Sequence, residues 1–227
     1  MNNKSIHTVI KILKGEVKKW EVPIVTKISK LAPAGGKQGN ERSPFKVLIS
    51  CILSLRTKDE TTSVASHKLF SLADTPKDML KLTKEEIEKT IYPVGFYRTK
   101  AGNILSICSE LINKYNSKVP DTIDELLKFK GVGRKTANLV VTLGYKKPGI
   151  CVDTHVHRIT NRWGYVKTKN PEETEFALRK KLPKKYWLII NDLLVTYGQN
   201  LCKPISPHCS ICQISKFCKK VGVGRRR

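Results

Sequence analysis

Two things are scarce in this sequence, acidic residues and long apolar runs, and each scarcity excludes a class of protein. Only 19 Asp and Glu oppose 43 Lys and Arg, so the formal net charge is +24 at pH 7. No apolar stretch approaches the roughly 18 residues that a membrane-spanning helix needs, and residues 1–20 lack the apolar block of a secretory signal. We therefore expect an intracellular protein that has no membrane partner.

The excess of positive charge favours a polyanionic partner, because each neutralised phosphate releases condensed counterions. Nucleic acid is the first such partner to consider. Charge alone leaves open a heavily solvated, thermophile-like surface or a structural RNA-binding protein, and it does not identify an enzyme.

The number of cysteines is odd, which argues against a framework in which all of them form disulfides. Three of the seven cysteines, Cys51, Cys108 and Cys151, each stand alone among apolar residues. That setting predicts reduced core residues in a reducing compartment.

The other four cysteines crowd into residues 202–218 with the spacing C-x6-C-x2-C-x5-C. Four thiolates so close in sequence can surround one site, and the spacing differs from the paired C-x2-C motifs of common zinc ribbons. Four-thiolate iron-sulfur ligation is the better match, with structural zinc and disulfides as alternatives. Lys203 in this loop would present a cation to a phosphate backbone. The predicted ligands are Cys202, Cys209, Cys212 and Cys218.

Alternating strand patterns are also lacking, and apolar residues recur at helical spacing, as in residues 187–197. We therefore predict an all-α protein of about ten short helices. Helix starts, marked by a capping residue with proline or an acidic first turn, are expected at Ser43, Thr75, Thr83, Asp121 and Asn170.

Turn-forming residues divide the chain. Residues 32–44 are the clearest candidate linker, and a second change in composition falls at residues 145–150. The block between them should be one helical unit, and the N- and C-terminal pieces should pack together as another. The end, residues 222–227, is predicted to be a mobile basic tail.

Residues 121–145 predict two helices joined by a very short turn that contains two glycines. Because the two glycines have no side chains, a ligand can approach the backbone of the turn and the unpaired N–H groups that begin the second helix. Such a contact holds a phosphate and reads no base sequence. An ordinary tight turn between helices is the alternative. The residues expected to contact phosphates are Lys130, Gly131, Val132, Gly133 and Arg134.

Lys135 occupies the first turn of that second helix, where the helix dipole and neighbouring Arg134 both favour the neutral, nucleophilic amine. A simple phosphate contact is the alternative. Asp153, after an apolar segment, suits either an N-cap or a carboxylate that takes a proton from an amine. Sequence alone does not bring Asp153 next to Lys135.

Three motifs in this order resemble the endonuclease III family of helix-hairpin-helix DNA glycosylases. They are the hairpin GVGRKTAN, the VDTH segment about twenty residues later, and the terminal cysteine loop. The resemblance extends from about residue 43 onward. It implies a six-helix barrel domain over residues 37–147 that carries the hairpin, residues 121–145. It also implies a second helical domain, residues 1–36 plus 148–227, that holds a [4Fe-4S] cluster in the loop 202–218.

The resemblance also implies roles for individual residues. Lys135 falls on the family's Schiff-base lysine and Asp153 on its catalytic aspartate. The partner would be double-stranded DNA containing damaged pyrimidines or abasic sites, with the protein acting as a monomer. The enzyme would flip out the damaged nucleotide, remove its base and nick the strand by β-elimination. It would be intracellular and DNA-associated, in the cytoplasm or nucleoid if the host is a prokaryote.

One departure concerns Arg56, which stands where many relatives have a glutamine thought to fill the gap left by the flipped nucleotide. Arg56 could fill the same gap or contact the orphan base, so lesion preference stays open. The alternatives are a glycosylase that removes thymine or uracil mispaired with guanine, and a non-catalytic DNA-binding module with a structural metal.

Overall fold

The computed structural model describes residues 3–21, 23–28 and 43–227, and every regular element in these ranges is helical. The predicted all-α fold is therefore confirmed. None of these helices is long and apolar enough to cross a membrane. Most of the predicted linker, residues 32–42, and the predicted domain boundary at residue 36 lie outside the described residues.

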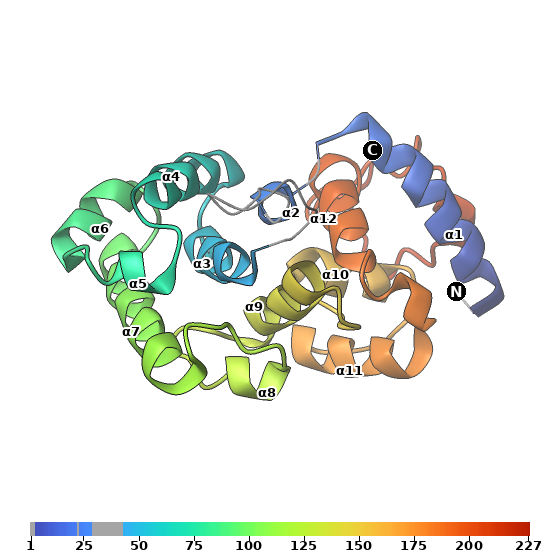
Figure 1. The fold of residues 1–227 in the computed structure, drawn as a ribbon. Helices are drawn as coiled ribbons and strands as arrows, with labels where there is room; N and C mark the ends of the chain where they lie inside the picture. The colour runs from blue at the N-terminus through green and yellow to red at the C-terminus, as the bar shows by residue number, and fades with distance from the viewer. Residues whose placement is uncertain (1–2, 22, 29–42) are drawn as a thin grey trace. The chain divides into compact units, whose positions relative to one another are not determined.

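The chain divides into two compact units (Figure 1). One combines Met1–Pro23 with Pro148–Arg227, and we call it the split unit. The other is Ile24–Lys147, which we call the continuous unit.

The continuous unit is built around one helix that is buried on all sides, α3. All nine residues from Phe45 to Leu53 are buried, and α3 contacts α2, α4, α7, α9 and η2. A mostly apolar helix that is buried on every face must be enclosed by others, and this requirement sets the arrangement of its neighbours. The helices are α2 (Ile24–Ile28), α3 (Pro44–Ser54), α4 (Asp59–Leu72), α5 (Pro76–Met79), α6 (Lys84–Ile91), α7 (Tyr97–Tyr115), α8 (Ile123–Leu126), α9 (Arg134–Leu139) and the π-helical η2 (Val140–Gly144).

The split unit closes its core with a helix from the N-terminal segment, α1. Ile6, Val9, Ile10 and Leu13 of α1 are buried in one apolar core with residues between 150 and 214. Each such aliphatic side chain contributes about 1.5–3 kcal/mol when it is fully buried. The elements are α1 (Asn3–Glu16), η1 (Val17–Lys19), α10 (Thr154–Arg162), α11 (Pro171–Lys181), η3 (Lys184–Tyr186), α12 (Ile190–Asn200) and η4 (Ser215–Phe217).

Four of the five predicted helix starts are confirmed by their caps. The side chains of Ser43, Thr75, Thr83 and Asn170 each accept a hydrogen bond from the backbone N–H three residues later. The prediction at Asp121 is wrong, because its carboxylate pairs with Lys147 and α8 begins two residues later. The expectation of short helices also fails at α7, which runs for 19 residues.

The basic end of the chain differs from the prediction of a mobile tail. The backbone N–H of Arg227 donates to the carbonyl of Pro207 at 2.9 Å, and Ser210 N–H donates to the Arg227 carbonyl at 2.9 Å. The tail is thus hydrogen-bonded to the cysteine loop. These partners are 17 and 20 residues away in sequence, so composition gave no sign of them.

Cys51, Cys108 and Cys151 are free and buried, which confirms them as reduced core residues. Burial raises the pKa of the Cys51 and Cys108 thiols to about 12. Both thiols therefore stay protonated and unreactive near neutral pH.

Candidate functional site

The two glycines of the hairpin turn, Gly131 and Gly133, lie in different surroundings. Gly131 has a φ of 82°, and a Cβ added there would lie 2.5 Å from Asn103 Nδ2, so the fold itself demands glycine. Gly133 has a φ of −99°, and a Cβ there would meet no atom within 4 Å. The bare backbone at Gly133 therefore leaves room for something outside the protein.

The turn also presents donors and positive charge. The backbone N–H groups of Gly131 and Gly133 have no acceptor within the ranges that the structure describes. Val132 between them is buried, which fixes the turn, whereas Lys130 beside them is exposed. Arg134 begins α9 and is half-buried. Open N–H groups flanked by cations are suited to a phosphate oxygen.

Lys135 is the second residue of α9 and is half-buried. It lies close enough to α3 for its charge to lower the pKa of the Cys51 thiol, against the larger effect of burial. The amine is thus placed where α9 packs on the central helix, a few residues after the open turn. The lysine therefore lies beside the turn that suits a phosphate.

Asp153 is the N-cap of α10. Its Oδ1 accepts hydrogen bonds from the backbone N–H groups of His155 and Val156, both at 2.9 Å. Its Oδ2 accepts no hydrogen bond from any described residue. The capping role expected from sequence is therefore present, and one oxygen is left for another task. Lys135 and Asp153 belong to different units, so their pairing stays a prediction.

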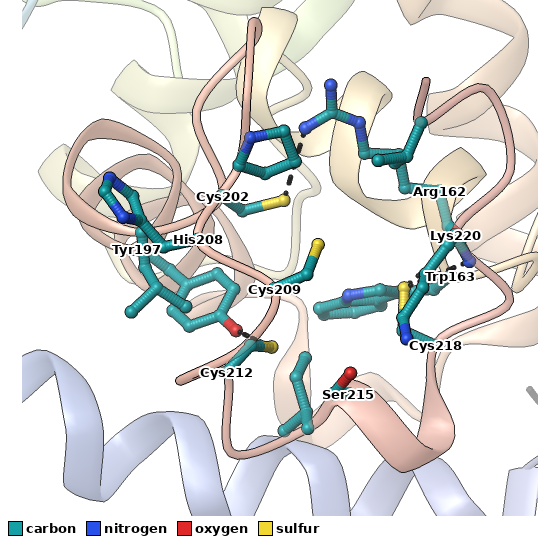
Figure 2. A pocket seen from close by; sticks show the side chains of 14 residues that line it. Arg162, Trp163, Tyr197, Cys202, His208, Cys209, Cys212, Ser215, Cys218 and Lys220 are labelled. Carbon is teal, nitrogen blue, oxygen red and sulfur yellow. Dashed lines mark hydrogen bonds between the residues drawn. The ribbon is translucent and has the colours of Figure 1, made fainter. Parts of the chain in front are cut away.

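The four cysteines of the loop line one pocket of the split unit, and Figure 2 shows their side chains around a shared hollow. All four are free thiols. In the described part of the chain, no three His, Cys, Asp or Glu side chains are grouped so that they could hold a metal ion. Three of the sulfurs have polar neighbours: Tyr197 Oη lies 2.9 Å from Cys212 Sγ, Arg162 Nη1 lies 3.5 Å from Cys202 Sγ, and Lys220 N lies 3.4 Å from Cys218 Sγ.

Arg162 organises this loop, and sequence analysis missed it. Its side chain is buried, and it donates to the carbonyls of Lys203 at 2.7 Å and Pro204 at 2.6 Å. The Arg162 carbonyl accepts from Val221 N–H on the far side of the loop. An arginine at the end of an amphipathic helix is normally a surface residue, so no local signal indicated these partners. Lys203 itself keeps its side chain exposed, as a phosphate contact requires.

Arg56 lies in the turn that follows α3. It is exposed and adopts the left-handed conformation, with a φ of 52°. Its guanidinium carbon lies 5.4 Å from the centre of the Phe96 ring, and Phe96 is exposed and left-handed as well. Two non-glycine residues in this region are together strained by a few kcal/mol, which commonly marks a functional turn.

The comparisons with known proteins agree with these features. Residues 49–184 match the family model described as HhH-GPD superfamily base excision DNA repair protein. Endonuclease III of Thermotoga maritima is 50% identical over 179 residues, which cover 79% of this chain and 84% of that protein. The chain spans about half, 48%, of the length of the chloroplastic endonuclease III homolog 1 of Arabidopsis thaliana, to which it is 43% identical over 77% of its own length.

A solved structure of a trapped endonuclease III–DNA covalent intermediate matches 87% of this chain and 93% of its own, with a TM-score of 0.75 and 37% identity. The fold and the matched model together define a base excision DNA repair protein with a helix-hairpin-helix. At the level of sequence identity found, the chain belongs to the endonuclease III family. The family predicted from the three motifs is therefore confirmed.

The two glycines of the turn should respond differently to alanine. Gly131→Ala should lower the free energy of unfolding by about 1–2 kcal/mol, because alanine is strained at positive φ and meets Asn103. Gly133→Ala should change stability by less than about 0.5 kcal/mol yet weaken DNA binding several-fold, since its methyl group projects into the open space. Denaturant unfolding and a fluorescence anisotropy titration measure the two effects. Unchanged DNA affinity of Gly133→Ala would contradict the phosphate contact.

Proposed function

We propose that this DNA glycosylase and abasic-site lyase removes oxidised pyrimidines from double-stranded DNA inside the cell, with Lys135 as its nucleophile. The observation that carries this proposal is the position of Lys135. This half-buried residue follows, by two residues, an open glycine turn whose N–H groups suit a phosphate. A lysine so placed is held close to the DNA backbone and to the sugar of an extruded nucleotide.

In the proposed reaction, the damaged nucleotide first leaves the base stack, because C1′ of its sugar is out of reach in the duplex. Lys135 Nζ then attacks C1′, and the bond from C1′ to the base breaks with its electron pair going to the base. Asp153 accepts a proton from the amine through Oδ2, the oxygen not used in capping, and passes it toward the leaving base.

Opening of the sugar ring then converts the adduct into an imine between Lys135 and C1′. The imine acidifies the proton on C2′, and removal of that proton breaks the C3′–O bond, which releases the 3′ phosphate and nicks the strand. Hydrolysis of the imine restores the free lysine. Lys135 thus forms and releases the covalent bond to the sugar, Asp153 moves the proton during base release, and water hydrolyses the imine.

We propose further DNA contacts beside the chemistry. The hairpin, from Lys130 to Arg134, would hold a phosphate, and exposed Lys203 would contact the backbone near the cysteine loop. Exposed Arg56 would enter the gap that the flipped nucleotide leaves. Its long side chain and planar guanidinium can stack against bases as well as donate hydrogen bonds.

We also propose that Cys202, Cys209, Cys212 and Cys218 hold a [4Fe-4S] cluster. Two observations support this cofactor: four free thiols line one hollow, and hydrogen-bond donors lie beside the sulfurs of Cys202 and Cys218. The bound cluster would supply rigidity to the loop and would take no part in the reaction at Lys135. The six-helix barrel domain predicted over residues 37–147 would correspond to the continuous unit.

Borohydride reduction of the reaction mixture tests the nucleophile. The protein should form a covalent adduct with a duplex containing an abasic site or an oxidised thymine, and Lys135→Ala should abolish it. Lys128→Ala is the matched control, since Lys128 lies in the same hairpin but its amine pairs with Glu125 at 2.5 Å. No adduct from folded wild-type protein would refute the lyase proposal. Faster base release from a thymine–guanine mispair than from oxidised thymine would favour the mismatch glycosylase.

Asp153→Asn separates capping from catalysis. Asparagine caps a helix as well as aspartate does, so the melting temperature should change little. The amide accepts no proton, so the single-turnover rate of base release should fall about 100-fold or more while DNA affinity is retained. An unchanged rate would remove Asp153 from the chemistry.

Purified protein should be brown and contain iron and sulfide at four of each per chain if the cluster is present. Cys212→Ala should lose the visible absorbance. Arg162→Met should lower the iron content, because the loop carbonyls of Lys203 and Pro204 lose their donor. Colourless protein that contains zinc would overturn the cofactor but leave the lysine mechanism intact.

A further inference from the structure

Lys100 is a buried cation that the reaction as described does not use. Its side chain lies in the first turn of α7, where the helix dipole disfavours positive charge, and the residue is only 5% exposed. It forms no salt bridge with any residue that the structure describes. Burial lowers the pKa of its amine to about 8. Such a position is costly, so the contacts of the amine need an explanation.

All three contacts of the Lys100 amine lie at the end of α3 and in the turn that follows it. Nζ donates to the carbonyl of Leu53 at 2.9 Å, to the carbonyl of Leu55 at 2.5 Å and to Thr57 Oγ1 at 3.2 Å. An ammonium has three N–H donors, and these acceptors match that number. Two of the acceptors belong to the neighbours of Arg56, so the amine holds the Leu55 carbonyl before it and the Thr57 hydroxyl after it.

A second contact ties the same turn to the segment before α7. Gly95 N–H donates to Thr57 Oγ1 at 3.2 Å, and a Cβ on Gly95 would lie 2.6 Å from the Arg56 carbonyl oxygen. Only glycine permits so close an approach. The left-handed turn at Arg56 is thus contacted both by the Lys100 amine and by the backbone of Gly95.

We propose that Lys100 is a positioning residue for Arg56, which fixes the turn so that the arginine side chain enters the gap as the nucleotide flips. This inference rests on the gap-filling role proposed above for Arg56. A turn held in place beforehand loses less entropy when its side chain is inserted, so base extrusion is faster. Lys100 touches neither the sugar nor the base, and its effect passes through the backbone of residues 55–57.

A double-mutant cycle of Lys100→Met and Arg56→Ala tests the proposal on a duplex that contains one oxidised thymine. Each single variant should lower the single-turnover rate of base release by about 10-fold or more, because misplacement by about 1 Å is enough to cost that much. Affinity for undamaged duplex, where no gap is filled, should change by less than about 3-fold. The double variant should be no slower than the slower single variant, since both changes remove the same step.

Lys46→Met is the matched control, because Lys46 is also a buried lysine of the continuous unit but pairs with Asp74 at 3.2 Å, away from the turn. Its rate should equal that of the wild type. If Lys100→Met proves too unstable to measure, Thr57→Val keeps the Lys100 amine and its two carbonyl acceptors but removes the hydroxyl that accepts from Lys100 and Gly95 and donates to the Leu55 carbonyl. This variant should show the same coupling to Arg56, with a smaller loss of rate.

Additive effects of the two substitutions, or an unchanged rate in Lys100→Met, would overturn the positioning role. Loss of rate in Lys100→Met with none in Arg56→Ala would also overturn it, since Lys100 would then act through something else. Failure of the proposed function looks different, because wild-type protein would then form no adduct under borohydride.

Discussion

The burial of α3 on every side is the constraint on which the continuous unit depends. Nine consecutive residues of this helix are buried, so it must be enclosed by five other elements before the unit is stable. The fit is close where η2 ends, since a Cβ on Gly144 would lie 3.1 Å from Pro44 Cα. The apolar helix thereby fixes the position of everything packed on it.

Both functional features of that unit are arranged by this helix. Its Cys51 faces the neighbourhood of Lys135 on α9, and its last turn leads directly into the backbone around Arg56. α3 therefore positions both the proposed nucleophile, Lys135, and Arg56, the residue proposed to fill the gap left by the flipped nucleotide. A shift of α3 would displace both together, which preserves their spacing.

In the split unit, α10 has the corresponding role. Asp153 caps its first turn, Arg158 reaches from its middle to the Cys202 carbonyl at 2.9 Å, and Arg162 holds the loop carbonyls near its end. A single helix of nine residues thus connects the proposed catalytic carboxylate to the cysteine pocket. Ordering of the loop and orientation of the carboxylate should consequently be linked.

Features with local causes could be predicted from the sequence, and features with distant partners could not. Caps at Ser43 and Thr83, the glycine turn and the shared pocket of four closely spaced cysteines all arise from residues near in sequence. The sequence did not reveal the roles of Lys100 and Arg162, because their hydrogen-bond acceptors lie about 40 residues away in the chain. Judged from its neighbours in sequence alone, each would be expected to be a surface cation. The error at Asp121 has the same origin, since Lys147 competes for its carboxylate.

The division of the chain has a consequence for the order of events on the ribosome. The continuous unit, Ile24–Lys147, is made without interruption and can complete its core while synthesis is still under way. The apolar face of α1 is made before the continuous unit but has no partner until residues 150–214 appear. The apolar face of α1 is therefore made before the continuous unit and buried after it.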